Sequence, residues 1–394
     1  MPINPLIKVC IVTTAFPRWS GDSRAPFIFG AARAVKNKGA HVKVIAMHNP
    51  GAETYEVMDG IPVYRPRYLP EKWEVLQKES GGIPQAWTKN PLSGLALIPF
   101  LVVHIIAIIR QAIDIDIIHA NWTISGAASI FTQWLHRKPT VITVQGSDIF
   151  NAPKIPLVKG ITKYVLGRAT QVLALSESLR IETIALGVPS ELVRVIPNGV
   201  DTDLFQPGLP RREPLVLFVG SLIERKGPKY LIEAMNFLRL DWPEVKLVII
   251  GEGSQFFELK NLVITLGLEN TVDFVGAQTQ ESVSSWLRRA KVFVLPSIEE
   301  GLGVVLLEAL SSATPCIGSS VGGIPDVITP DVGVLFPPCD SKKLADGIWE
   351  LVHDPHKWQI YSDNARKRAE TIYSWDKIGD EIIDVYQTAI GRRG

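Results

Sequence analysis

Short runs of aliphatic residues alternate with helix-length segments along the whole chain. The runs occupy residues 8–13, 41–46, 115–119, 140–143 and 171–175, and then 215–220, 246–251, 271–275, 292–295 and 315–318. Apolar runs of this length between helical segments are typical of parallel strands that are buried on both faces. The pattern therefore predicts an α/β protein with two parallel sheets, each covered by helices.

A polar, proline-rich segment interrupts the alternation at residues 205–214 and has no periodicity, which favours an interdomain linker. The chain has 394 residues and so exceeds the usual span of one hydrophobic core. We therefore predict an N-terminal domain over 1–205 and a C-terminal domain over 206–372. Residues 373–394 carry apolar side chains at helical spacing, which predicts a final amphipathic helix.

Charge and cysteine usage exclude several classes of protein. Lys and Arg number 41 and Asp and Glu 40, so the chain lacks the basic excess that drives sequence-independent binding to nucleic acid. Three cysteines without paired spacing argue against a disulfide framework or a zinc site. Residues 1–17 lead directly into a strand and lack the basic and apolar regions of a signal peptide. These features predict a cytoplasmic protein.

The stretch 292–313 contains the clearest candidate for a binding site. Its pattern predicts a buried strand over 292–295, a glycine-rich loop over 299–303 and a helix from 304. The unpaired N–H groups and positive dipole at a helix start suit a phosphate, and Gly301 and Gly303 let a ligand approach the main chain. The sequence therefore predicts an anion site in this loop.

Two carboxylates lie next to this predicted anion site. Glu300 is at its mouth, and Glu308 lies inside an apolar helical run, where a carboxylate is costly unless something binds it. Ionised carboxylates only accept hydrogen bonds, so the pair suits a ligand that carries hydroxyls as well as phosphate. The alternative is that Glu308 lies on an exposed helix face.

The spacing Glu300-Gly301-x-Gly303 followed by Glu308 resembles the signature of glycosyltransferase family 4, which comprises retaining, nucleotide-sugar-dependent enzymes. Further blocks resemble the family in the family's order: Phe218-Val219-Gly220-Ser221 with Lys226-Gly227, Val248 to Gly253, Ile196 to Asp201, and Gly322 to Asp326. The resemblance implies a GT-B fold, in which two Rossmann-like domains face each other across a cleft. It places the acceptor on the first domain and the donor on the second, and it implies that helix 373–394 crosses back to the first domain.

The resemblance also implies roles for individual residues. Glu308 is expected to accept hydrogen bonds from the ribose hydroxyls of the donor, and Glu300 from its sugar hydroxyls. Lys226 and the N–H groups around Gly303 and Val304 are expected to hold the diphosphate. A cation placed there neutralises the charge that develops on the departing diphosphate.

The chain departs from the family pattern at several positions. Ser221 stands where the family usually has an arginine, which Arg225 could replace, and only Gly21 is present in a loop that is usually glycine-rich. Gln145 stands where the family has a histidine beside the donor sugar, and it cannot hold a proton charge near neutral pH. In front-face retaining transfer the leaving phosphate oxygen takes the acceptor proton, so Gln145 can keep a positioning role. Asn198 is a secondary candidate for donor binding.

We therefore predict a retaining hexosyltransferase of polysaccharide biosynthesis that needs no cofactor or metal. Its acceptor is predicted to be a glycan, a polysaccharide precursor or a lipid-linked sugar. A GT-B nucleotide-sugar 2-epimerase and a catalytically silent partner subunit are the alternatives. An NAD-dependent oxidoreductase is disfavoured, because Gly251-Glu252-Gly253 lacks the third glycine of the dinucleotide fingerprint.

Residues 92–109 form the most hydrophobic window of the chain. Pro99 and His104 interrupt it and a strand of the same domain follows, so a buried or half-buried helix is predicted rather than a spanning one. The alternative is a surface that, with Trp73 and Trp87, rests on the inner face of the cell membrane and receives a lipid-linked acceptor.

Overall fold

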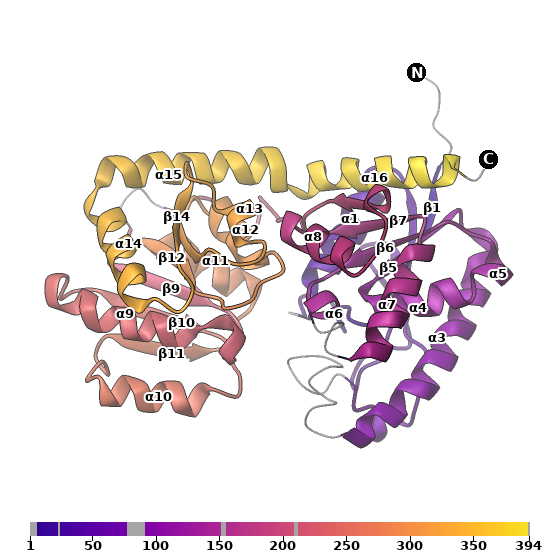
Figure 1. Cartoon of the computed structure of the whole chain (residues 1–394), viewed down its shortest axis with the longest axis horizontal. Helices are drawn as coiled ribbons and strands as arrows, with labels where there is room; N and C mark the ends of the chain where they lie inside the picture. Colours follow the sequence, from indigo (N-terminus) through magenta and orange to yellow (C-terminus); the bar gives the residue numbers. More distant parts are fainter. Residues whose placement is uncertain (1–5, 23, 77–90, 151–154, 209–211, 393–394) are drawn as a thin grey trace. The chain divides into compact units, whose positions relative to one another are not determined.

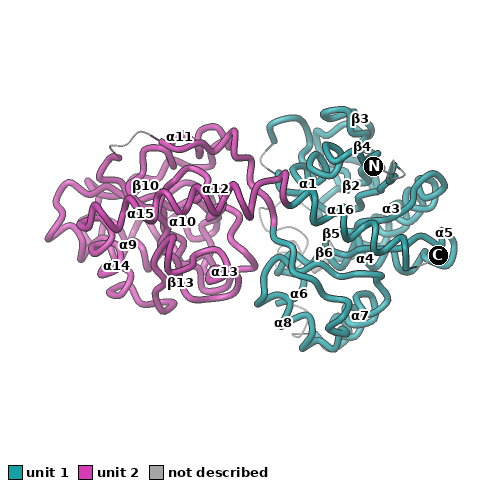
Figure 2. The backbone as a smooth tube through the Cα atoms, turned by 90° about the horizontal axis from the view of Figure 1, so that it is seen from above, with its two compact units in different colours: residues 1–197, 378–394 teal, residues 198–377 magenta. Residues whose placement is uncertain are grey.

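The computed structural model describes residues 6–22, 24–76, 91–150, 155–208 and 212–392. The chain forms two compact units (Figure 2): unit 1 comprises residues 1–197 and 378–394, and unit 2 comprises residues 198–377. The division lies between Pro197 and Asn198, upstream of the segment 205–214, because Phe205 is buried in unit 2 and its carbonyl accepts a hydrogen bond from Ser311.

Unit 1 is built on an eight-stranded sheet with the order β3-β4-β2-β1-β5-β6-β7-β8. Its strands are β1 (Lys8–Thr13), β2 (His41–Ala46), β3 (Tyr55–Met58), β4 (Ile61–Tyr64), β5 (Ile117–Asn121), β6 (Thr140–Val144), β7 (Gln171–Ala174) and β8 (Val193–Val195). All neighbours are parallel except β3, which pairs antiparallel with β4. Asp59 and Gly60, both with positive φ, form the two-residue turn of this hairpin.

Helices cover both faces of this sheet (Figure 1). They are α1 (Pro26–Asn37), α3 (Leu97–Gln111), α4 (Trp122–Phe131), α5 (Gln133–His136), α6 (Ser147–Phe150), α7 (Pro156–Arg168) and α8 (Glu177–Ala185). Short 3₁₀ turns occur at Glu71–Trp73, Pro91–Ala96, Ala112–Asp114 and Ser190–Leu192. The last helix, α16 (Trp375–Gly391), begins in unit 2 and belongs to unit 1 from Ile378 onward.

Unit 2 is built on a six-stranded parallel sheet with the order β11-β10-β9-β12-β13-β14. Its strands are β9 (Leu215–Val219), β10 (Lys246–Ile250), β11 (Val272–Gly276), β12 (Val292–Leu295), β13 (Cys316–Ser319) and β14 (Gly333–Phe336). Its helical segments are a 3₁₀ turn at Glu224–Lys226, α9 (Pro228–Asp241), α10 (Phe256–Thr265), α11 (Gln280–Arg289), α12 (Val304–Ser311), α13 (Ile324–Val327), α14 (Ser341–His353), α15 (Pro355–Arg368) and a π-helical turn at Ala369–Tyr373.

The central strands of unit 2 are buried on both faces, as the continuous apolar runs predict. All four residues of β12 are buried, because helices cover the sheet on each side. Burying a side chain of the size of valine or leucine contributes about 1.5–3 kcal/mol relative to leaving it exposed. This rigid sheet supports the loops that leave its edge.

The order of strands in unit 2 brings two particular loops together. From β9 the chain moves to β10 and β11 on one side, and later to β12, β13 and β14 on the other. The loops that follow β9 and β12 therefore leave the carboxyl edge of the sheet next to each other. Such a switch point is where open α/β sheets bind their ligands.

Candidate functional site

Lys226 and Glu300 meet at this switch point of unit 2. Lys226 follows β9 and Glu300 follows β12, and the Lys226 ammonium donates a hydrogen bond of 2.5 Å to Glu300 Oε2. Ser297 Oγ donates to the same oxygen at 3.1 Å, and both ends of the ion pair are largely buried. The predicted cation and the first predicted carboxylate thus share one site.

The surroundings of Glu300 keep it ionised. Burial opposes its ionisation, but the charge and hydrogen bond of Lys226, with smaller contributions from Arg225 and Ser297, hold the pKa of Glu300 below its ordinary value. A carboxylate in this state accepts hydrogen bonds, as the hydroxyls of a sugar require.

The site depends on close approaches of the main chain. Gly227 has φ +64°, and a Cβ at this position would collide with the carbonyl oxygen of Pro296, the residue after β12. Gly322 has φ +52°, and a Cβ there would collide with the carbonyl oxygen of Glu300. These glycines let the loops after β9 and β13 pack against the loop that carries Glu300.

Gly227→Ala is expected to destabilise the protein by more than the cost of a left-handed alanine, which is about 1–2 kcal/mol. Gly267→Ala is the matched control, because Gly267 has φ +63° but a Cβ there would come no closer than 3.6 Å to Arg239. Urea denaturation of both variants measures the difference. Equal losses of unfolding free energy would contradict a steric role for the Pro296 contact.

Two helices begin at this site without a side-chain cap. Helix α9 starts after Gly227 and α12 after Gly303, and neither cap residue has a side chain that could accept from the first N–H groups. Helices α11, α14 and α15 of the same unit are capped by the side chains of Thr279, Asp340 and Asp354. The N–H groups at the start of α12 therefore suit an external anion. The start of α9 offers fewer donors, because Pro228 has no N–H and the Tyr230 N–H donates to the Gly227 carbonyl.

Glu308 lies on α12, half-buried among Leu306, Leu307 and Ala309. Burial raises the pKa of Glu308 to about 8, and a hydrogen bond with the Gln280 side chain only partly offsets that rise. Within the described residues Glu308 has no ion pair. An acid kept here without a cation costs stability, which favours a role in binding over a role in folding.

The other predicted donor-site residues of unit 2 lie on the same edge or near it. Gly301 and Val304 belong to the loop and helix that carry Glu300 and Glu308, and Ser221 lies at the start of the loop after β9. Arg225 faces Glu299 at 3.8 Å rather than Glu300.

Asn198 opens unit 2 and is buried. Its Nδ2 has no hydrogen-bond partner among the described residues.

Gln145 follows β6 in unit 1, where it donates a hydrogen bond of 3.1 Å to Asn121 Oδ1 at the end of β5. The Asp148 carboxylate accepts from the backbone N–H groups of Gln145, Gly146 and Thr123. Burial raises the pKa of Asp148 to about 6, although these N–H groups act against the rise. Asn121 and the capping role of Asp148 were not predicted. The sequence offered two signals for these contacts: an Asn at the end of a strand, and an Asp three residues after Gln145 that could accept from nearby backbone N–H groups.

His119 of β5 is a buried core residue. Its ring nitrogens lie 2.6 Å from Tyr386 Oη and 2.7 Å from Thr143 Oγ1, and burial lowers its pKa to about 4.

The loop that carries Gly21 is closed by its own side chains. Arg18 donates to both carboxylate oxygens of Asp22 at 2.8 and 3.0 Å, and the backbone N–H of Arg18 donates to the same group. Gly21 has φ +83° and open space around its Cβ position. The hydrogen bonds from Arg18 therefore fix the Asp22 carboxylate within its own loop.

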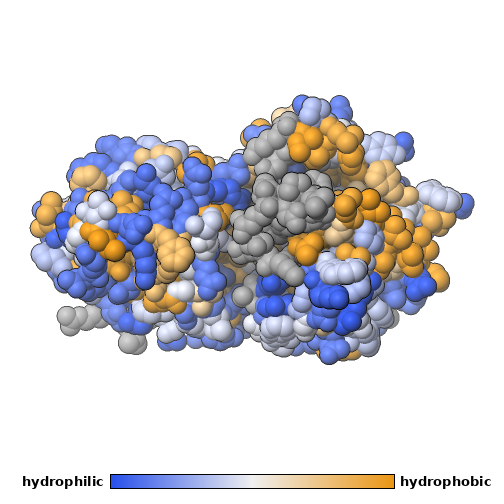
Figure 3. Space-filling model, turned by 90° about the horizontal axis from the view of Figure 1, so that it is seen from below, coloured by the Kyte–Doolittle hydropathy of each residue, from blue (hydrophilic) through white to orange (hydrophobic). Residues whose placement is uncertain are grey.

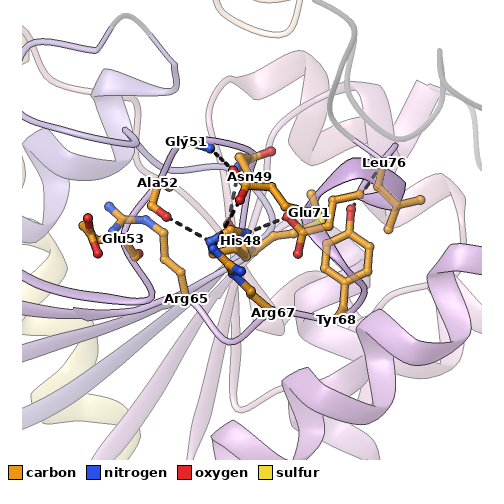
Figure 4. Close-up of polar contacts among 12 residues, drawn as sticks. His48, Asn49, Gly51, Ala52, Glu53, Arg65, Arg67, Tyr68, Glu71 and Leu76 are labelled. Carbon is orange, nitrogen blue, oxygen red and sulfur yellow. Dashed lines mark hydrogen bonds and ion pairs between the residues drawn. The ribbon is translucent and has the colours of Figure 1, made fainter.

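A polar cluster at the carboxyl ends of β2 and β4 was not predicted (Figure 4). His48 Nδ1 lies 2.6 Å from Glu74 Oε2 and its Nε2 lies 2.9 Å from the carbonyl of Ala52. Glu71 accepts from the backbone of Gly51 at 2.6 Å and from Arg67 at 3.2 Å. These bonds fix the loop after β2 to the segment after β4, which is a structural role.

Among the described residues no group of three or more His, Cys, Asp or Glu side chains could hold a metal ion. Trp87 lies outside the described residues, and Trp73 is exposed on the turn Glu71–Trp73.

Two family models match nearly the whole chain between them. The model described as "Glycosyl transferases group 1" matches residues 200–368, and the model described as "Glycosyltransferase Family 4" matches residues 27–204. Their junction falls close to the division between the two units.

Similar proteins include an uncharacterised glycosyltransferase of Methanocaldococcus jannaschii, which is 27% identical over 98% of this chain and 100% of its own length. The D-inositol 3-phosphate glycosyltransferase of Xylanimonas cellulosilytica is 28% identical over 93% of this chain and 92% of its own. Among solved structures, sucrose-phosphate synthase of Thermosynechococcus elongatus superposes with a TM-score of 0.80 at 22% identity, covering 98% and 100% of the two chains. HepE of Anabaena in complex with UDP-glucose gives 0.75 at 20% identity, covering 97% and 100%.

Proposed function

Because the chain belongs to the group 1 and family 4 glycosyltransferases and has their GT-B fold, we propose that it moves a sugar from a nucleotide-diphosphate sugar to a hydroxyl acceptor with retention of anomeric configuration. The family and the fold predicted from the sequence are both confirmed. The donor type, the stereochemistry and the acceptor belong to the proposal.

The observation that carries the proposal is the Lys226–Glu300 pair at the switch point of unit 2. A diphosphate at the uncapped start of α12 would lie beside the Lys226 ammonium. Glu300 would then accept from the sugar hydroxyls and Glu308 from the ribose hydroxyls. The solved HepE complexes contain UDP and UDP-glucose, which supports a donor of this class for the present chain.

Retention is part of the proposal, because the family resemblance implies front-face transfer. Gln145 is neutral and hydrogen-bonded to Asn121, so it can position a sugar but cannot remove a proton. The acceptor hydroxyl would attack the anomeric carbon from the face that the diphosphate leaves. Its proton would pass to the leaving phosphate oxygen, whose charge Lys226 stabilises. The cytoplasmic location and a glycan or lipid-linked acceptor stay predictions.

A melting-temperature screen with UDP-glucose, UDP-N-acetylglucosamine and GDP-mannose tests the proposal. A ligand that binds only the folded state at about one hundred times its dissociation constant adds about 2.7 kcal/mol of stability. At least one nucleotide sugar is expected to raise the melting temperature of the wild type, but not of Glu308→Gln. Binding without release of nucleotide in the presence of sugar acceptors would instead indicate a silent subunit, and a shift of equal size in both proteins would remove Glu308 from the site.

A further inference from the structure

Helix α3 exposes an apolar stripe on the outside of unit 1. Ile98, Val102 and Ile106 lie four residues apart and are exposed, while Phe100 and His104 face the interior. The segment Gly94–Asp114 is long and apolar enough to cross a membrane, with a mean hydropathy of 2.1, yet only 28% of its most apolar window is buried. A core helix of a globular domain would be mostly buried, and a surface helix would carry polar residues on its outer side.

Two further helices continue this apolar surface. Helices α3 and α7 both pack against α4 (Figure 1). Helix α7 exposes Leu157, Ile161 and Tyr164 at helical spacing, and α5, which follows α4, exposes Trp134. Figure 3 shows the molecule from below the view of Figure 1, which is the side on which α3 lies, and hydrophobic residues gather there on unit 1. We call the exposed side chains of these three helices the α3–α5–α7 face. Apolar patches of this extent on a protein surface mark contact with a partner or a membrane.

The charges on these helices all have one sign. Residues 97–111, 122–136 and 156–168 contain no Asp or Glu, although the chain has 40 acidic residues among its 394. The same ranges contain Arg110, Lys159, Lys163 and Arg168. Burial lowers the pKa of His104 to about 4, so this histidine adds no charge near neutral pH. An apolar surface whose helices carry only cations complements an anionic lipid surface, although exposed Asp114 follows the end of α3 and pairs with Lys8.

We propose that the α3–α5–α7 face docks on an anionic lipid bilayer and lies on it without spanning it. Spanning would remove Phe100 and Ile108 from the core, which α3 helps to close. Exposed Trp134 and Tyr164 are amphipathic side chains that suit the headgroup region. A second copy of the chain is a poorer occupant, because a two-fold interface would bring the same basic residues against each other.

Co-sedimentation with phosphatidylcholine vesicles, with and without phosphatidylglycerol, tests the proposal. The wild type is expected to bind the anionic vesicles and to release them at high salt. The double variant Trp134→Ser/Leu157→Ser is expected to bind roughly tenfold or more weakly, since it removes two side chains that insert into the interface. Leu240→Ser/Phe257→Ser is the matched control, because these unit 2 side chains are 75% and 78% exposed against 74% and 73% for Trp134 and Leu157.

Lack of binding to anionic vesicles by the wild type would overturn the proposal. An equal loss of vesicle binding in Leu240→Ser/Phe257→Ser would also overturn it. Sedimentation velocity tests whether the face instead binds a second copy of the chain. A wild-type dimer that becomes a monomer in Trp134→Ser/Leu157→Ser would make the face a self-association surface, which also overturns it. None of these residues belongs to the proposed donor site, so the result is independent of sugar transfer.

Discussion

Lys226→Ala is expected to lower kcat/KM for sugar transfer by about a hundredfold to a thousandfold, the usual effect of removing one pre-placed group that stabilises charge in a transition state. The ammonium lies 2.5 Å from Glu300 Oε2 at the switch point of the sheet, where a leaving diphosphate would meet it. The measurement is nucleotide release from the sugar donor found in the melting-temperature screen. If Lys226→Ala transferred sugar at the wild-type rate, Lys226 would have no role in the chemical step.

Lys229→Ala controls for the loss of a nearby positive charge. Lys229 lies on the first turn of α9, is half-exposed and pairs only loosely with Glu233 at 3.8 Å, so its removal is expected to lower kcat/KM far less than the removal of Lys226. Because Lys226→Ala leaves Glu300 buried without its cation, Lys226→Ala/Glu300→Gln is measured as well. We expect the double variant to regain melting temperature but not activity, which separates a catalytic defect from a folding defect.

Glu308→Gln is expected to remove the pH dependence of donor binding and most of the affinity. The pKa of Glu308 is about 8 in the free protein, whereas ribose hydroxyls need its ionised, accepting form. Wild-type affinity should therefore rise about tenfold per pH unit up to about pH 8 and then level off, with release of a proton on binding. Calorimetric titrations at several pH values, in buffers of different ionisation enthalpy, measure both effects. An affinity that does not change with pH would contradict the role of Glu308.

The same substitution is expected to stabilise the free protein. The pKa of Glu308 is raised from 4.5 to about 8, so between these pH values the folded chain keeps a proton that the unfolded chain has released. Its contribution to stability is therefore largest below about pH 4.5 and decreases as the pH rises through this window. Glu308→Gln avoids that decrease, and at neutral pH we expect a gain of about 2 kcal/mol, after a discount for partial exposure. Denaturation at two pH values would detect the gain.

Much of the fold could be predicted from the sequence, because strands buried on both faces leave continuous apolar runs. β1, β2 and β12 have the predicted bounds, and the start of α12 after Gly303 follows from the glycine loop. The antiparallel hairpin β3–β4 was not predicted, although Asp59-Gly60 between two short apolar runs is a recognised turn signal. Its strands are only four residues long, which leaves little periodicity to detect.

The candidate site could be predicted in composition but not in geometry. Glu300 and Glu308 are marked by local spacing, whereas the hydrogen bond between Lys226 and Glu300 joins residues 74 positions apart. That contact depends on the order of strands, which brings β9 next to β12 and cannot be deduced from local pattern. The partnership of Gln145 with Asn121 was missed for the same reason. Residues 92–109 were predicted to form a buried or half-buried helix, but only 28% of the most apolar window is buried, and the exposed stripe of α3 appears only in the folded unit.

A crystal structure with the bound nucleotide sugar that gives the largest rise in melting temperature tests most directly whether Lys226, Glu300 and Glu308 hold one donor. We expect both ribose hydroxyls within about 2.7–3.2 Å of the Glu308 carboxylate and the diphosphate between Lys226 and the first N–H groups of α12. A nucleotide bound elsewhere, with Glu308 still facing only Gln280, would contradict the proposed site.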